Sequence, residues 1–96
     1  MDWIKDKAGV IEETQIHSST LGGLPAMEVI VKYRDKRGNV ARVCRSLAAI
    51  RRIRPNDTMG IIYEIILDTS AERLDQHNLV FEAVVKSFRL DPLSHY

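Results

Sequence analysis

The stretch from Gly60 to Asp68 (GIIYEIILD), together with the segment that follows it, decides the fold of this chain. It is a near-continuous apolar run interrupted by Glu64, which is typical of a central strand that is covered on both faces. Thr69 and Glu72 then form a capping-box pattern, in which a hydroxyl and a carboxylate satisfy backbone amides at the start of a helix. The sequence therefore predicts a strand that passes directly into a helix near residue 70.

The segment from about residue 70 to residue 88 has the periodicity of an amphipathic helix. Its apolar side chains form one stripe at helical spacing, made of Leu74, Phe81, Val84, Val85 and Phe88. Polar and charged side chains mostly fall on the opposite side, among them Arg73, Asp75, Gln76, Glu82, Lys86 and Arg89. Pro92 prevents the helix from continuing. We therefore expect one helix with one buried face.

The residues before this run indicate strands joined by turns. Ala26 to Tyr33 shows the clearest alternation, and a weaker strand is predicted from Val10 to His17. Between them, Ser18 to Pro25 is a turn cluster that contains two adjacent glycines. A short helix is expected over residues 2–7, ended by Gly9.

The segment Val40 to Arg54 fits helical spacing and strand alternation about equally well. The polar turn before it, Asp35 to Asn39, has hairpin chemistry, with Gly38 and Asn39 suited to positive φ. The run from Ile61 to Leu67 also needs an antiparallel neighbour. Both considerations favour a strand here.

These elements predict an α+β fold: an antiparallel sheet of four to five strands, a C-terminal helix packed across one face, and a short N-terminal helix. The 96 residues suit a single domain over 1–96, and a hydrophobic fraction of 45% is that of a globular protein. No apolar run approaches the roughly 20 residues of a membrane span. No signal peptide is seen, so the chain is expected in the cytoplasm unless it is a fragment of a longer protein. A sheet of this size has edges, which makes an edge-strand dimer conceivable.

The sequence offers no catalytic or metal-binding pattern. The single cysteine, Cys44, excludes an internal disulfide, and the three histidines are far apart and lack ligands at metal spacing. Glu12 and Glu13 are adjacent on a predicted strand, so they point to opposite faces and do not form an acid–base pair. The sequence predicts no enzyme activity, no cofactor and no metal.

The charge is uneven, because a basic central third is hidden in a net charge of +1. Between residues 34 and 54 Asp35 is the sole acid, against eight basic residues: Arg34, Lys36, Arg37, Arg42, Arg45, Arg51, Arg52 and Arg54. A row of arginines on a sheet attracts an acidic protein surface or phosphates. We predict partner binding by Arg42, Arg45, Arg51 and Arg52, with an acidic protein as partner and nucleic acid as the alternative. A solvated sheet face balanced by the acidic helix is the third interpretation.

Three short motifs occur in order along the chain: Glu12-Glu13-Thr14 followed by Gly23-Leu24-Pro25-Ala26, then Tyr63 to Thr69 (YEIILDT), then Phe81 to Phe88 (FEAVVKSF). This order resembles the PsbP-like family, which includes extrinsic proteins of the oxygen-evolving photosystem, bacterial relatives and a Ran-binding nuclear import factor. The resemblance covers about residues 4 to 90 and implies a non-catalytic interaction domain. Domains of that family usually begin with further strands, which implies a reduced domain or the C-terminal part of a larger one. None of the family's metal-binding or partner-binding residues matches a position in this chain.

Overall fold

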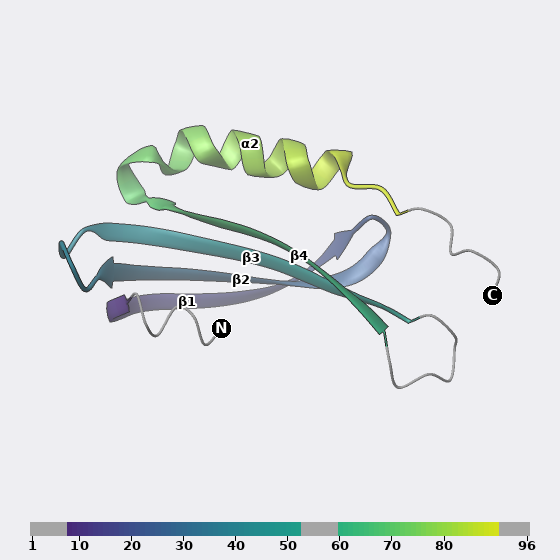
Figure 1. Cartoon of the computed structure of the whole chain (residues 1–96), viewed down its shortest axis with the longest axis horizontal. Coiled ribbons are helices and arrows are strands. Elements are labelled where there is room, and N and C mark those ends of the chain that lie inside the picture. Colours follow the sequence, from purple (N-terminus) through teal and green to yellow (C-terminus); the bar gives the residue numbers. More distant parts are fainter. Residues whose placement is uncertain (1–7, 53–59, 91–96) are drawn as a thin grey trace.

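The computed structural model describes residues 8–52 and 60–90 of the chain. These residues form four strands followed by a helix (Figure 1): β1 (Ala8–Leu21), β2 (Leu24–Asp35), β3 (Ala41–Arg52), β4 (Gly60–Ser70), the single 3₁₀ turn η1 (Ala71–Arg73) and α2 (Leu74–Ser87). The strands make one antiparallel sheet with the order β1-β2-β3-β4, and α2 lies across one face of it. The predicted α+β class is confirmed.

Three details of the predicted architecture differ or fall outside this description. The described residues contain four strands and no fifth. The short helix expected over residues 2–7 lies outside the described residues. β4 was expected in the centre of the sheet, and this prediction is wrong, because β4 pairs only with β3 and forms an edge. An apolar run indicates that both faces of a strand are covered. It does not indicate whether another strand is hydrogen-bonded to it along each edge.

β1 is longer than predicted at both ends. Gly9 lies inside this strand, and the strand continues through Ser18–Leu21, a stretch that was predicted to be a turn. The turn itself is only Gly22 and Gly23, whose φ angles of 56° and 83° are the left-handed values that a two-residue hairpin turn requires. Pairing therefore runs to the last possible pair, Leu21 with Leu24.

The second hairpin forms as predicted. Asp35 and Val40 are joined by a backbone hydrogen bond of 3.0 Å, and Asn39 takes a φ of 53°. The Asp35 carboxylate also accepts a hydrogen bond from the Arg37 amide at 2.7 Å, which fixes the turn. Residues 41–52 are strand β3, so the strand interpretation of this segment is confirmed and the helical one is wrong.

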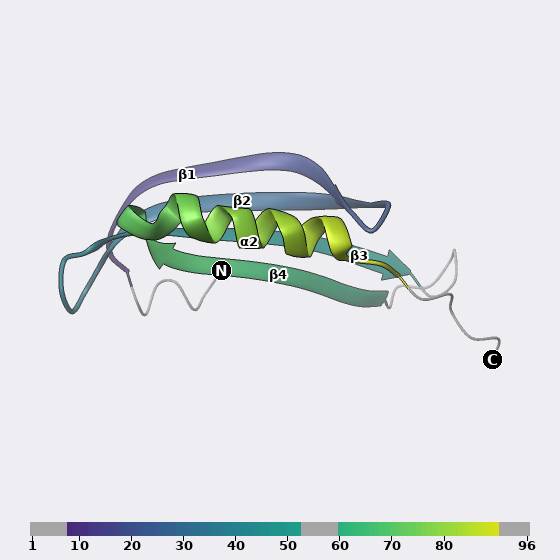
Figure 2. The same cartoon turned by 90° about the horizontal axis from the view of Figure 1, so that it is seen from above.

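The main core lies between the sheet and α2 (Figure 2). Leu21, Leu47, Ala49 and Phe81 are buried there, and Leu24, Tyr63, Ile65, Leu67, Val85 and Phe88 pack around them. Within the predicted apolar stripe of the helix, Val84 is the exception, since it is exposed. Among the described residues, no helix combines the length and apolarity that a bilayer crossing requires.

The C-terminal end of α2 packs against the turn between β1 and β2 and against β4. The Phe88 ring meets the Tyr63 ring edge to face, with centroids 5.5 Å apart and an interplanar angle of 71°. A Cβ atom on Gly22 would lie 2.9 Å from the same Phe88 ring. Gly22 is therefore required twice, once for its backbone angle and once for the room that it leaves for Phe88.

We call the opposite side of the sheet the open face. Residues that pair across strands share a face, and successive residues alternate. The register places these residues on the open face: Ile11, Thr14, Ile16, Ser18, Thr20, Pro25, Met27, Val29, Val31, Tyr33, Arg42, Cys44, Ser46, Ala48, Ile50, Arg52, Ile62, Glu64, Ile66 and Asp68. At one end of it Ala8, Val31, Tyr33 and Cys44 form a second, smaller buried cluster. As predicted, Met27, Val29, Val31 and Tyr33 lie on one face.

Candidate functional site

The four arginines predicted to bind a partner are not brought together by the fold. Arg42 lies near the start of β3, whereas Arg51 and Arg52 lie at its end, roughly 30 Å away at about 3.3 Å per residue. Alternation along the strand places Arg42 and Arg52 on the open face, and Arg45 and Arg51 on the helix side. Within the part of the chain that the structure describes, these four side chains do not form one surface.

Arg45 connects the sheet to the helix. One of its terminal nitrogens, Nη2, lies 2.8 Å from Glu28 of β2 and 3.1 Å from Glu82 of α2, while Nη1 donates to Asn78 at 3.0 Å. The guanidinium also stacks over the Phe81 ring, 4.4 Å from its centroid. With only 15% of its side chain exposed, Arg45 is committed to internal contacts.

A neighbouring strand neutralises one more residue of the basic segment. Arg34 of β2 lies 3.1 Å from Glu12 of β1. Just before the segment, Lys32 of β2 likewise lies 3.2 Å from Glu13 of β1. Antiparallel pairing thus places acidic residues of the remainder beside basic residues that are distant in the sequence, and the charge of Arg34 is balanced.

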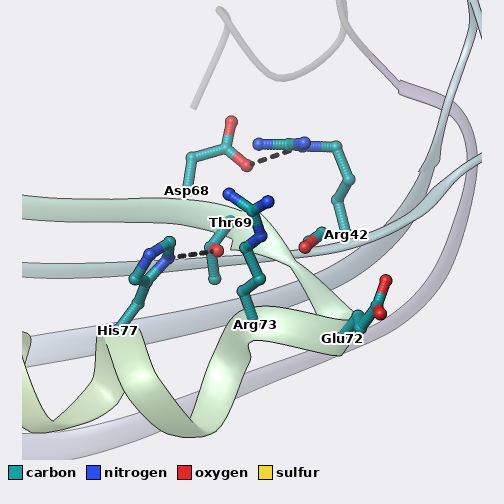
Figure 3. A pocket seen from close by; sticks show the side chains of 7 residues that line it. Arg42, Asp68, Thr69, Glu72, Arg73 and His77 are labelled. Atoms are coloured by element: carbon teal, nitrogen blue, oxygen red, sulfur yellow. Dashed lines mark hydrogen bonds and ion pairs between the residues drawn. The ribbon is translucent and has the colours of Figure 1, made fainter.

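A polar pocket lies where β4 passes into η1, at the end of the sheet that holds Arg42 (Figure 3). Its volume is about 400 Å³, and it is lined by Arg42, Asp68, Thr69, Ser70, Glu72, Arg73 and His77. Only Arg42 among these was predicted as a site residue. The others lie in the strand-to-helix segment, where Thr69 and Glu72 were predicted to cap the helix.

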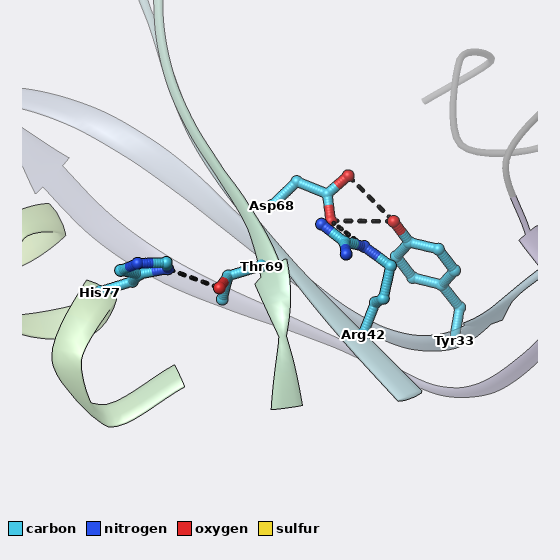
Figure 4. A network of polar contacts seen from close by, with 5 residues as sticks. All are labelled: Tyr33, Arg42, Asp68, Thr69 and His77. Atoms are coloured by element: carbon cyan, nitrogen blue, oxygen red, sulfur yellow. Dashed lines mark hydrogen bonds and ion pairs between the residues drawn. The ribbon is translucent and has the colours of Figure 1, made fainter. Parts of the chain in front are cut away.

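A network anchored on Asp68 forms one wall of this pocket (Figure 4). The fully buried Tyr33 donates from its hydroxyl to both Asp68 carboxylate oxygens, at 2.8 and 2.9 Å. Arg42 donates from Nε to the Oδ1 atom at 3.2 Å. Burial, and then the hydrogen bond to Asp68, raise the pKa of Tyr33 to about 12. Tyr33 therefore stays protonated at neutral pH, and its role is to hold Asp68 in place.

Thr69 and His77 form the second contact between the sheet and the helix start. The Thr69 hydroxyl and His77 Nδ1 share a hydrogen bond between β4 and the first turn of α2. The predicted capping box is wrong, because Ser70 is the residue that precedes η1 and no side chain caps it. The Thr69 side chain is buried and turned toward His77, since residue 69 lies on the helix side of the sheet.

Arg73 is the cation of the pocket that the fold leaves available. Its guanidinium points toward the Arg42–Asp68 pair (Figure 3), and no described residue lies within ion-pair distance of it. The Asp68 charge is already offset by Arg42 in the pair. Among the described residues, the pocket thus presents one guanidinium without an ion pair, beside a hydroxyl, Ser70, and an imidazole, His77. The Glu72 carboxylate also lines the pocket and points away from this guanidinium (Figure 3). The arrangement around Arg73 suits a carboxylate or phosphate oxygen.

Metal ligation is not built into the described residues, which contain no group of three or more His, Cys, Asp or Glu side chains placed to hold an ion. Comparisons of the chain with protein-family models, with curated proteins and with solved structures found no match.

Proposed function

We propose that the protein is a non-catalytic interaction domain that binds an acidic segment of another protein, with a carboxylate of that partner seated at Arg73. The observation that carries the proposal is the unpaired Arg73 guanidinium in a polar pocket of about 400 Å³. The acidic partner agrees with the expectation from the basic central third, but the site moves from four arginines along β3 to the pocket at the end of β4.

The groups around Arg73 favour binding over reaction. Asp68 is held by Tyr33 and Arg42, and the Thr69 hydroxyl is buried against His77. A tyrosine whose pKa lies near 12 is a poor acid or base at neutral pH. These groups are fixed in mutual contacts, which is the arrangement that a preorganised recognition pocket needs.

The resemblance to the PsbP-like family is retained as part of this proposal. Its three motifs lie on structural positions: Gly23 to Ala26 spans the first turn and the start of β2, Tyr63 to Thr69 lies in β4, and Phe81 to Phe88 covers most of the packed face of α2. These placements support a shared scaffold. They assign no partner, because only Asp68 and Thr69 among the motif residues line the pocket.

Fluorescence anisotropy with a labelled glutamate-rich decapeptide tests the proposal at low salt. We expect saturable binding that weakens at least about tenfold in Arg73→Glu, since a charge-assisted contact of roughly 1.5–3 kcal/mol is replaced by repulsion. Arg37→Glu is the matched control, because Arg37 carries the same charge in the exposed turn between β2 and β3. It is expected to bind like the wild type.

A labelled 20-nucleotide single strand is the second probe, and it decides between the two kinds of partner. Tighter binding of this strand, with affinity that falls by about 0.7 log units per log unit of salt for each phosphate neutralised, would favour the nucleic-acid alternative. Absence of binding to either probe would overturn the proposal. Equal losses in Arg73→Glu and Arg37→Glu would show that binding follows net charge and does not depend on the pocket.

A further inference from the structure

Large apolar side chains are exposed across the open face, on all four strands. The exposed fractions are 64% for Ile16, 63% for Ile50 and 67% for Ile62, and Met27 and Ile66 are close to half exposed. Between them lies an apolar hollow of about 340 Å³ whose lining includes Pro25, Met27, Ala48 and Ile50. Singly exposed apolar residues are ordinary on a protein surface, but a set that crosses a whole sheet face indicates an interaction surface.

The sequence of β4 agrees with this interpretation. Its apolar run is typical of a strand covered on both faces, yet α2 covers only one of them, where Ile65 and Leu67 pack. Ile62 and Ile66 point to the other side and are exposed. Edge strands usually carry charges that keep other chains away, whereas Glu64 is the only charged residue from Gly60 to Leu67.

The charge on the open face favours a second copy of this chain as the partner. The face carries four charged side chains, two acidic and two basic, and Arg42 is already paired with Asp68 at 3.2 Å. A nearly neutral surface gives little attraction to an acidic protein, a nucleic acid or an anionic membrane. Two such surfaces do not repel each other, so charge does not oppose the pairing of two copies through the same face.

The size of the exposed part of the face suits a weak dimer. Four strands spaced about 4.8 Å apart and about 12 residues long at roughly 3.3 Å per residue give a whole face of about 750 Å². Its end around Tyr33 and Cys44 is already buried, so a smaller area is left for a partner. Stable interfaces bury about 800 Å² on each partner, and smaller ones belong to weak complexes. We propose that two copies pack with their open faces together and form a two-layer β-sandwich with an α2 helix on each outer side.

Sheet-on-sheet packing accounts for the large apolar side chains and the hollow on the open face. Sheets that pack this way lie about 10 Å apart and interdigitate their inner side chains at an angle of about 30°. Isoleucines at positions 16, 50, 62 and 66 supply the projecting side chains, and the hollow at Ala48 supplies space between them. This interface differs from the edge-strand dimer that the sequence suggested, because the strands meet through side chains and not through backbone hydrogen bonds. Its isoleucines do not line the Arg73 pocket, although Arg42 and Asp68 belong to both surfaces.

Sedimentation of the full chain over about 1–200 µM, with a paired substitution and its control, tests the proposal. We expect the wild type to reach twice its chain mass of 11.0 kDa. Ile50→Glu with Ile62→Glu should remain monomeric at least about tenfold above the wild-type midpoint. The matched control, Leu79→Glu with Val80→Glu, changes two equally exposed residues on the outside of α2 and should dimerise normally. Circular dichroism confirms that both variants are folded.

A wild type that stays monomeric at all these concentrations would overturn the proposal. So would a dimer that survives the open-face substitutions, or one that is lost only in the α2 control.

A second readout does not depend on the paired variant: Ile62→Cys should react with a thiol reagent more slowly as the protein concentration rises, whereas Leu79→Cys should not. The native thiol, Cys44, is buried and gives only a slow background. Equal reactivity of Ile62→Cys at both ends of the concentration range would likewise overturn the proposal.

Discussion

The two faces of the sheet are built from similar amounts of apolar sequence but have different surroundings. On the helix side, Leu47 and Phe81 are almost completely buried, and Arg45 ties both layers together. On the open face, Ile50 and Ile62 are mostly exposed, and only the end near Tyr33 is buried. The comparison teaches that strand alternation determines which residues share a face, whereas the coverage of that face is a separate property. Substitutions on one face at a time measure how much the side chains of that face contribute to the stability of the fold.

The largest effect is expected at Phe81 on the helix side. Phe81→Ala should lower the free energy of unfolding by about 3–5 kcal/mol, because the ring is buried and its loss leaves a cavity between the layers. Its neighbour Val80 is exposed, so Val80→Ala should change the value by about 0.5 kcal/mol or less. Urea denaturation of the three proteins measures both values. Similar losses at the two positions would mean that α2 does not pack as described.

Arg45→Met is expected to have the next largest effect, a loss of about 3 kcal/mol. The reason is that Glu28, also largely buried, would be left without its positive partner. Arg34→Ala is the control, because the Arg34–Glu12 pair is solvent-exposed and exposed pairs contribute about 0–1 kcal/mol.

The double variant Arg45→Met with Glu28→Leu sharpens this prediction by removing both charges. It should recover a large part of the loss, since apolar groups of similar volume often replace a buried ion pair without penalty. If the double variant is no more stable than the single one, the contact of the Arg45 guanidinium with the Phe81 ring is the dominant contribution.

Tyr33, at the buried end of the open face, should give a smaller effect that depends on pH. Tyr33→Phe removes the hydrogen bonds to Asp68 and should cost about 2 kcal/mol at pH 8. Because folding raises the pKa of Tyr33 from 10 to about 12, this stabilisation is complete below pH 10 and is lost as the pH rises through 12. Urea unfolding at pH 8, 10 and 11 checks whether the difference between wild type and variant narrows. A constant difference would contradict the assignment.

The smallest effect is expected where the sheet extends beyond α2, at the exposed pair of Glu13 and Lys32. Hydrogen bonds from Gln15 and Lys32 lower the pKa of the Glu13 carboxyl. Its contribution to stability is therefore present above the ordinary pKa of 4.5 and is lost as the pH falls through the folded-state value. Lys32→Ala should flatten this part of the pH–stability curve slightly. An unchanged slope between pH 5 and 3 would show that the pair contributes nothing.

The period-two alternation of apolar residues and the residues typical of hairpin turns predicted most of the strands and turns correctly. The alternation from Met27 to Tyr33 and the turn at Asn39 were sufficient to place β2 and β3. The edge position of β4 was missed, because an apolar strand has the same pattern whether a helix, another sheet or a second copy covers it. The end of β1 was also missed, since Ser18 and Thr20 suit an exposed strand position as well as a turn.

The candidate site was less predictable than the fold. Arg45 and Arg42 are three residues apart, and only the register of three strands and a helix shows that one pairs internally with Glu28 while the other lines a pocket. The capping-box pattern was present at Thr69, but a partner eight residues away, His77, competed for the hydroxyl. Such competition between local and distant partners is decided by tertiary packing, which a single sequence does not display.

The packing of Phe88 against Gly22 has a consequence for the synthesis of the chain. The ribosome synthesises β1 to β4 before α2. The Leu21 side chain is therefore not buried until Phe81 and Phe88 have been added to the chain. At about 5–20 residues per second, this delay lasts roughly 3–13 s. For the last 1–4 s of it, roughly, β4 is complete and the face that α2 will cover is exposed in the nascent chain. Slow translation of the α2 codons is therefore expected to increase aggregation more than slow translation of any earlier element.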